Sequence, residues 1–201
     1  MTPGSTEQAR QRLRERTQEI LERPRAAVDP EAAAREKAVV HECRYLMRLL
    51  STRRRSAGEM RARLTQREVP AAVAHEALAR IDRAGLVDDA AFAHEWVDQR
   101  RALRALSDEA LRRELRDRDV DEQHIEDALG GEGRSGEEQR CRDLVRSRLR
   151  SEQARLAADH DGAHRRRLQR RLDALLTRKG YPGDLAVQVI SSELRAAAPG
   201  P

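Results

Sequence analysis

The chain has 201 residues, of which 37% are charged and only 2% are aromatic, and it carries a formal net charge of +5. Because β-sandwiches and large compact cores depend on aromatic and β-branched side chains, this composition argues against both. Arg, Ala, Glu and Leu dominate and favour helices, so the sequence predicts an all-α protein made of thin helical modules with small cores.

Several chemical classes are disfavoured by the same composition. The two cysteines, Cys43 and Cys141, are too few for a disulfide framework, and no Cys–His spacing suits zinc. Residues 1–16 contain no apolar run that could act as a signal peptide or a membrane span. No phosphate-binding glycine loop or nucleophile elbow is present. We therefore expect a cytoplasmic protein with no catalytic residues, no cofactor, no metal and no membrane partner.

Residues 1–36 form a predicted N-terminal extension. They contain seven arginines and seven acidic residues, few apolar residues, and two prolines, Pro24 and Pro30, that interrupt any helical pattern. Such a segment buries too little surface to offset the entropy of ordering. We predict a flexible extension with at most a transient helix from Gln8 to Arg23.

An internal repeat begins near Lys37. Four apolar positions mark a helix, a turn and a second helix, and they recur at offsets of 51 and then 61 residues: Met60, Leu64, Val69 and Leu78; Leu111, Leu115, Val120 and Leu129; Leu172, Leu176, Tyr181 and Ile190. After each turn comes Pro70, Asp121 or Pro182, and both residue types start helices. A further amphipathic helix precedes each pair. The sequence therefore predicts three tandem three-helix units at 37–86, 87–131 and 136–196, the last with longer helices.

Local signals mark the ends of several helices. Ser56 and Glu59 have the spacing of a capping box, and Ser107 is a second helix start. At the joint between the first two units, Gly85 suits a left-handed helix end and Asp88 suits the cap of the next helix. The glycines between Gly130 and Gly136 predict a flexible hinge before the third unit.

Several of these segments resemble the RecX family. Gly85-Leu86-Val87-Asp88-Asp89-Ala90-Ala91-Phe92-Ala93 is similar to the family signature between its first two repeats. Arg55-Ser56-x-x-Glu59-Met60-x-x-x-Leu64 resembles the start of the second helix of the first repeat, and Lys179-Gly180-Tyr181 resembles the turn of the third. The resemblance covers about residues 37–195. It implies an elongated, curved monomer that binds in the groove of the RecA filament and inhibits its recombinase, ATPase and coprotease activities, with weak contact to single- or double-stranded DNA.

The sequence departs from the family pattern at two turns. The family commonly has glycine just before the apolar turn residue, and Gly180 keeps it, but Glu68 and Asp119 replace it in the first two units. If these positions require a positive φ, aspartate has a modest cost and glutamate a larger one. The departure bears on turn geometry and not on the fold.

Charge alternates along the repeat. Residues 37–85 carry a net +6, residues 86–135 a net −6 and residues 136–201 a net +5. Two basic ends beside an acidic middle suit a surface of mixed sign, such as a protein filament wound on DNA. The alternative is that these charges only solvate helix faces.

Ten arginines are candidate contacts with RecA or DNA. They form one cluster at a predicted turn, a weaker pair offset by acidic neighbours, and one cluster on a predicted helix: Arg53, Arg54 and Arg55; Arg112 and Arg113; Arg165, Arg166, Arg167, Arg170 and Arg171. Residues four apart, such as Arg167 and Arg171, share a helix face. For each cluster the alternative is a solubilising surface.

The remaining conspicuous residues have structural explanations. Phe92 and Trp96 lie four apart on one predicted helix face, so we expect core packing that anchors the first unit to the second, with base stacking on Trp96 as the alternative. Leu64, Leu115 and Leu176 are predicted core residues of their units. Asp88 and Asp89 are better explained by helix capping than by catalysis.

Two other function classes stay open at this point. A general nucleic-acid-binding helical protein without a specific protein partner fits the basic ends but not the acidic middle unit. An unrecognised enzyme has no residue constellation in its favour.

Overall fold

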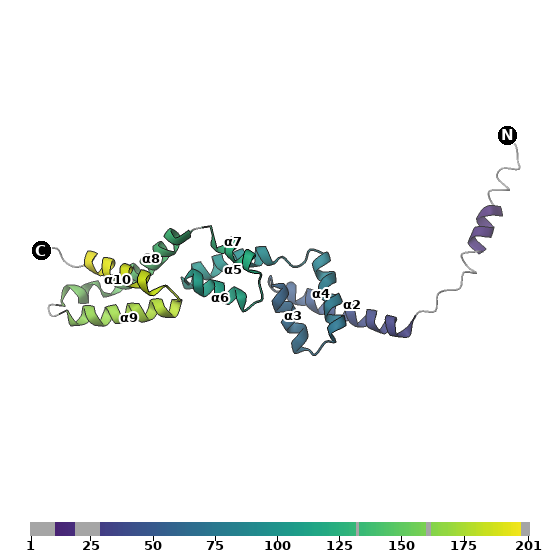
Figure 1. The fold of residues 1–201 in the computed structure, drawn as a ribbon, viewed down its shortest axis with the longest axis horizontal. Helices are drawn as coiled ribbons and strands as arrows, with labels where there is room; N and C mark the ends of the chain where they lie inside the picture. The colour runs from purple at the N-terminus through teal and green to yellow at the C-terminus, as the bar shows by residue number, and fades with distance from the viewer. Residues whose placement is uncertain (1–10, 19–28, 132, 160–161, 198–201) are drawn as a thin grey trace, which may run out of the picture.

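A computed structural model describes residues 11–18, 29–131, 133–159 and 162–197, and within these ranges every regular element is a helix. Figure 1 shows an elongated molecule in which three groups of helices follow one another along the long axis. The first group is α2 (Pro30–Leu50), α3 (Ala57–Gln66) and α4 (Ala71–Arg83). The second is α5 (Asp89–Arg104), α6 (Asp108–Arg116) and α7 (Glu122–Leu129). The third is α8 (Gly133–Ala157), α9 (Ala163–Lys179) and α10 (Gly183–Ala196). The all-α architecture of three-helix units is confirmed.

Each unit has a small hydrophobic core of its own. The buried residues fall into three separate clusters, one from each group of helices. The predicted core residues Leu64, Leu115 and Leu176 are fully buried, one in each cluster. In each of the helix pairs that pack most extensively, both helices come from the same unit. A chain poor in aromatic residues therefore buries its leucines and valines in three thin layers rather than in one large core.

Short polar side chains cap the starts of α2, α3, α5, α6 and α7, whereas the residues at the N-cap positions of α4, α9 and α10 make no side-chain capping bond. The Ser56 hydroxyl accepts a hydrogen bond from the Glu59 amide at 3.0 Å, and the Ser107 hydroxyl accepts one from the Ala110 amide at 3.1 Å. Asp88 accepts from the Ala91 amide at 2.8 Å. These bonds satisfy amide groups that have no partner within the helix.

The first helix begins before the predicted boundary of its unit. We predicted a start at Lys37, but α2 begins at Pro30 because Asp29 accepts a hydrogen bond from the Glu31 amide at 3.0 Å and proline is well suited to the first helical position. Glu36 accepts two bonds of 2.7 Å from Arg80 of α4. Residues 30–36 are thus part of the first unit and not of the extension. Of the segment before them, residues 11–18 are helical, and the rest of it lies outside the described residues.

The third unit also begins early. Its first helix starts at Gly133 and not at Gly136, so α8 takes up part of the segment that we predicted as a hinge.

The turn between the second and third helices has one geometry in all three units. Glu68, Asp119 and Gly180 have φ values of 57°, 54° and 83°. In each case the next residue donates its amide to a carbonyl near the end of the preceding helix: Val69 to Leu64 at 3.1 Å, Val120 to Leu115 at 3.3 Å and Tyr181 to Leu176 at 3.1 Å. The glycine of the third turn therefore marks a left-handed position that glutamate and aspartate also occupy in this chain.

Candidate functional site

The first arginine cluster lies at the turn between α2 and α3, and its three side chains differ in environment. Arg53 donates to Glu59 at 3.0 Å, and Arg54 donates to Glu95 of α5 at 3.1 Å. Arg55 is only 12% exposed and donates to the Leu49 carbonyl at 3.3 Å. Burial lowers the pKa of Arg55. Arg53 and Arg54 can exchange their partners for an external anion, whereas Arg55 is part of the folded turn.

A wide groove of about 820 Å³ adjoins this cluster, between α3 and the end of α6. Its charged lining consists of five arginines and three carboxylates: Arg53, Arg55, Arg61, Arg63 and Arg118; Glu59, Asp117 and Asp119. Within it Arg61 pairs with Asp119 across the two units, and Arg118 lies 3.6 Å from Glu59. The groove is therefore of mixed sign.

The central pair of arginines divides in the same way. Arg112 makes two bonds with Glu126, at 2.6 and 3.2 Å, and one with Glu109 at 2.9 Å. The Glu126 carboxylate raises the pKa of Arg112, which thus belongs to the packing of α6 on α7. Arg113 is exposed and, among the residues that the structure describes, forms no ion pair.

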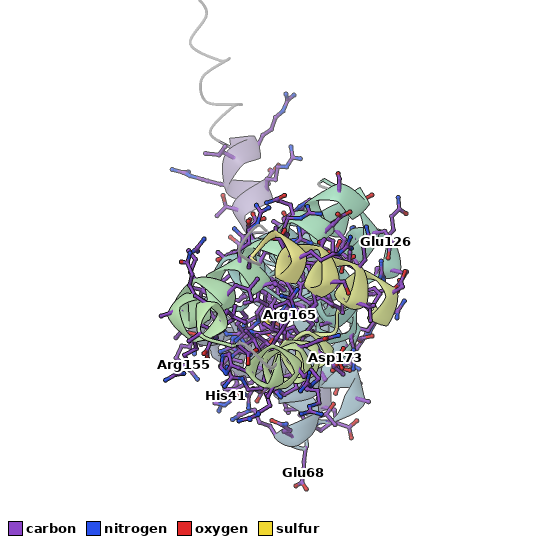
Figure 2. All side chains as sticks on the ribbon, turned by 90° about the vertical axis from the view of Figure 1, so that its left-hand side faces the viewer. His41, Glu68, Glu126, Arg155, Arg165 and Asp173 are labelled. Atoms are coloured by element: carbon purple, nitrogen blue, oxygen red, sulfur yellow. The ribbon has the colours of Figure 1, made fainter. Side chains whose placement is uncertain are left out.

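The third cluster does not form a single patch. Arg165 donates to the Leu194 carbonyl of α10 at 2.8 Å, and Figure 2 places it toward the middle of the molecule when viewed along the long axis. Arg171 pairs with Glu152 of α8. Arg166, Arg167 and Arg170 are exposed. Arg171 is also 59% exposed, so every side chain of the cluster except Arg165 reaches the surface of the unit.

Phe92 and Trp96 pack within the second unit. Phe92 is 3% exposed in the core of that unit, and the partly exposed Trp96 ring lies 5.7 Å from it, centroid to centroid. The guanidinium carbons of Arg100 and Arg118 lie 4.0 and 3.8 Å from the Trp96 centroid, and its Nε1 donates to Glu114 at 2.8 Å. The predicted core packing of the two aromatics is confirmed within the second unit, where Phe92 is buried and Trp96 packs against the same cluster. With arginines and Phe92 already against the indole, the geometry also disfavours base stacking.

The joint between the first two units is made at the start of α3. The Ser56 hydroxyl donates to the Arg118 carbonyl at 2.8 Å, and the Ala57 amide donates to Asp89 at 2.8 Å. A Cβ added at Gly58 would lie 2.3 Å from the Arg118 carbonyl oxygen. Asp89, which we predicted as a cap of its own helix, thus holds the neighbouring unit, and its burial raises the pKa of its carboxyl group.

The joint between the second and third units has the same construction. The Ser107 amide donates to the Lys179 carbonyl at 3.0 Å, and the Tyr181 hydroxyl donates to the Ala105 carbonyl at 3.1 Å. A Cβ added at Gly180 would lie 2.8 Å from the Ala110 Cβ. In both joints the turn of one unit packs on the start of the middle helix of the preceding unit. At each joint a glycine, which has no side chain, permits this close approach. At the first joint it is Gly58 on the helix, and at the second it is Gly180 in the turn.

Sequence reasoning missed these joints and a second basic groove. Arg148 and Arg178 line a groove between α8 and α9 together with Arg171. Neither belongs to a run of consecutive arginines, but Arg171 and Arg178 are seven residues apart and so lie on one face of α9. Helical spacing could have found this row, whereas its partner on α8 required the tertiary structure.

Other classes of site find no support in the part of the chain that the structure describes. No group of three or more His, Cys, Asp or Glu residues is placed there to hold a metal ion. Among those residues, no helix combines the length and the apolar character that crossing a membrane requires.

Comparisons with known proteins agree with the repeat architecture. The family model described as the first three-helix domain of RecX matches residues 44–80, and the one described as its second three-helix domain matches residues 88–129. Two crystal structures share the fold: RecX from Lactobacillus salivarius has a TM-score of 0.64 at 17% identity, covering 80% of this chain and 99% of that one. A second, titled regulatory protein RecX, has a TM-score of 0.63 at 19% identity and covers 81% of this chain and 75% of that one.

Sequence relatives extend this likeness over most of the chain. The protein named Regulatory protein RecX of Mycobacterium tuberculosis is 39% identical over 167 residues, covering 83% of this chain and 92% of that protein. Its namesake of Mycobacterium avium is 41% identical over 150 residues, covering 75% and 83%. With three-helix units in tandem, two of them matched by RecX domain models, and relatives that align over nearly their whole length, this chain belongs to the RecX family of regulatory proteins.

Proposed function

We propose that this protein is a non-catalytic, cytoplasmic monomer that binds the RecA–DNA filament and inhibits its recombinase, ATPase and coprotease activities. In this way it would act in homologous recombination, DNA repair and the SOS response. The observation that carries the proposal is the match of its tandem three-helix units to regulatory RecX proteins.

The shape of the molecule supports this function. Three small cores in a row give a long surface, which suits contact along a filament. Such elongated repeats use extended surfaces to bind macromolecules.

Charge supports the same interpretation. The basic first and third units would meet acidic protein groups or phosphates, and the acidic second unit would meet basic protein groups. On the first unit the available cations are Arg53 and Arg54, and on the third they are Arg167 and Arg170, since Arg55, Arg112, Arg165 and Arg171 are engaged within the fold.

A RecA strand-exchange assay with substoichiometric amounts of this protein tests the proposal. We expect inhibition well below one molecule per RecA, together with a lower ATPase rate and less coprotease cleavage. A protein that leaves all three activities unchanged, but holds naked DNA tightly with a steep salt dependence, would instead be a general nucleic-acid-binding protein.

A further inference from the structure

The hairpin of α8 and α9 concentrates positive charge. From Arg146 to Lys179 the chain has 11 basic and four acidic residues, a net +7, whereas residues 136–201 as a whole carry +5. The excess charge of the third unit therefore lies on these two helices.

A groove of about 280 Å³ lies between the two helices. Its apolar lining is Leu168, Leu172 and Leu175 of α9. Arg148 of α8 stands on one side, and Arg171 and Arg178 of α9 stand on the other. Arg167, four residues before Arg171, extends the row along the same face of α9.

The carboxylate in this groove is already neutralised by the fold. The Glu152 side chain is 11% exposed and contacts Arg171, Arg155 at 3.2 Å and His164 at 3.2 Å. Arg171 is the largest cause of the lowered pKa of Glu152. In Figure 2 Arg155 lies at the outer edge of the molecule. By contrast Arg148 and Arg178 are exposed and have no carboxylate partner within the described residues, so the groove keeps an excess of positive charge.

We propose that the α8–α9 groove binds the phosphodiester backbone of a nucleic-acid strand, with Arg148 and Arg178 as phosphate contacts on opposite walls. Guanidinium groups bind phosphate oxygens through two parallel hydrogen bonds. A nucleic-acid strand carries one negative charge per nucleotide, so successive phosphates can contact both walls of the groove at once. The proposal rests on the proposed function only in that a RecA filament would bring DNA close to the groove. Its test needs no RecA.

The test compares two double variants of equal charge. R148E/R178E alters both walls of the groove. R150E/R195E changes the net charge equally in the same unit, but Arg150 faces the separate α8–α10 groove and Arg195 lies at the end of α10. Binding of a fluorescein-labelled single-stranded oligothymidylate is followed by fluorescence anisotropy over a series of salt concentrations, with circular dichroism as the folding check. A second pair, R148Q/R178Q and R150Q/R195Q, replaces the first pair if charge reversal perturbs folding.

We expect R148E/R178E to weaken binding by at least about tenfold and to lower the magnitude of the log–log salt slope by about 1.4, because each single-strand phosphate contact contributes about 0.7. R150E/R195E should stay within about threefold of the wild type, with its slope unchanged. Equal weakening by both variants would show an effect of net charge alone, and no weakening by either would show that no strand binds here. Both outcomes overturn the proposal.

Strand-exchange assays on the same proteins separate this proposal from the proposed function. Normal DNA binding with lost RecA inhibition in R148E/R178E would assign the groove to a protein contact and overturn the nucleic-acid proposal alone. In another outcome R148E/R178E loses DNA binding as expected, but the wild type does not inhibit RecA. That result would overturn the proposed function and leave the groove assignment standing.

Discussion

At the scale of single residues, the arginines of this protein fall into two groups that the sequence does not separate. Arg55, Arg112 and Arg165 are held by carbonyl or carboxylate oxygens within their own unit. Arg54 forms an exposed pair with Glu95, and such a pair contributes little to stability. Arg53 is itself half-exposed, and its partner Glu59 also lies beside Arg55 and Arg118, so the carboxylate keeps other cations when Arg53 binds elsewhere. The second group can therefore serve binding without serving the fold.

Neutralising Arg53 and Arg54 should weaken RecA inhibition severalfold and leave helicity unchanged. Glutamine is the better replacement, because glutamate would place like charges beside Glu59 and Glu95. The matched control is R35Q/R44Q, two exposed arginines of α2 away from the turn. The measurement is the inhibition constant in a RecA ATPase assay, and equal inhibition by R53Q/R54Q, R35Q/R44Q and the wild type would remove the turn from the interface.

Phe92 should be the more costly of the two aromatics to remove. Because its ring is buried in the core of the second unit, Phe92→Ala should lower the free energy of unfolding by about 3–5 kcal/mol. Trp96→Ala should cost less, since the indole is partly exposed and its closest partners are polar. Urea unfolding followed by circular dichroism measures both, and a loss below about 1 kcal/mol for Phe92→Ala would contradict the packing described here.

At the scale of elements, the turn between the second and third helices repeats more faithfully than its sequence. Glu68 adopts a φ of 57° without being glycine, and Figure 2 shows its side chain projecting away from the ribbon. Left-handed backbone costs a residue with a Cβ about 1–2 kcal/mol. The first turn therefore retains strain that the third avoids with Gly180.

Relieving this strain should stabilise the protein. Glu68→Gly should raise the free energy of unfolding by about 0.5–1 kcal/mol, after the entropy of the more flexible unfolded chain is subtracted. Glu68→Ala is the control, since it removes the same exposed side chain but keeps the Cβ, and it should give no gain. Chemical denaturation compares the free energies of unfolding of the two variants. An equal gain in both would mean that the Glu68 side chain, and not the left-handed backbone, destabilises the wild type.

The joints between units depend on backbone contact, so a single methyl group should disturb them. Gly58→Ala should change the arrangement of the first two units and weaken RecA inhibition while keeping the helices, because its Cβ would meet the Arg118 carbonyl oxygen at 2.3 Å. The control is Gly183→Ala, whose Cβ would have no atom within 4 Å.

Small-angle X-ray scattering reports the change at Gly58 as a different maximum dimension, and circular dichroism reports that helicity is retained. If Gly58→Ala and Gly183→Ala give the same scattering curve and the same inhibition, the contact between α3 and the end of α6 does not set the arrangement of the units.

At the scale of the whole molecule, the first helix of the first unit begins at Pro30, with Asp29 as its cap, and not at Lys37. A truncated chain that starts at Asp29 should keep the melting temperature and the RecA inhibition of the full chain. A chain that starts at Lys37 should melt at a lower temperature, because it lacks the Asp29 cap, worth about 0.5–2 kcal/mol, and the contact of Glu36 with Arg80. Thermal unfolding compares them. Equal melting temperatures would place residues 29–36 outside the folded unit. If the chain that starts at Asp29 no longer inhibited RecA, residues 1–28 would make a contact with the partner.

Much of the fold could be predicted from the sequence, because its determinants are local. Apolar residues three and four apart placed the helices, and Leu64, Leu115 and Leu176 marked the cores, since one side of each helix must be buried. Ser56, Ser107 and Asp88 marked helix starts because a cap acts over only two or three residues. The recurrence of these signals at offsets of 51 and 61 residues indicated three similar units.

The tertiary structure alone decided how the units meet and which cations remain available. Ser56 and Asp89 act on residues of a neighbouring unit, and the need for Gly58 comes from the backbone of Arg118. Likewise Arg178 and Arg148 become one groove only when α9 lies beside α8. Hydrogen bonds, ion pairs and close packing act over a few ångströms in space, and segments that are distant in the chain reach that range only after the units have folded and docked.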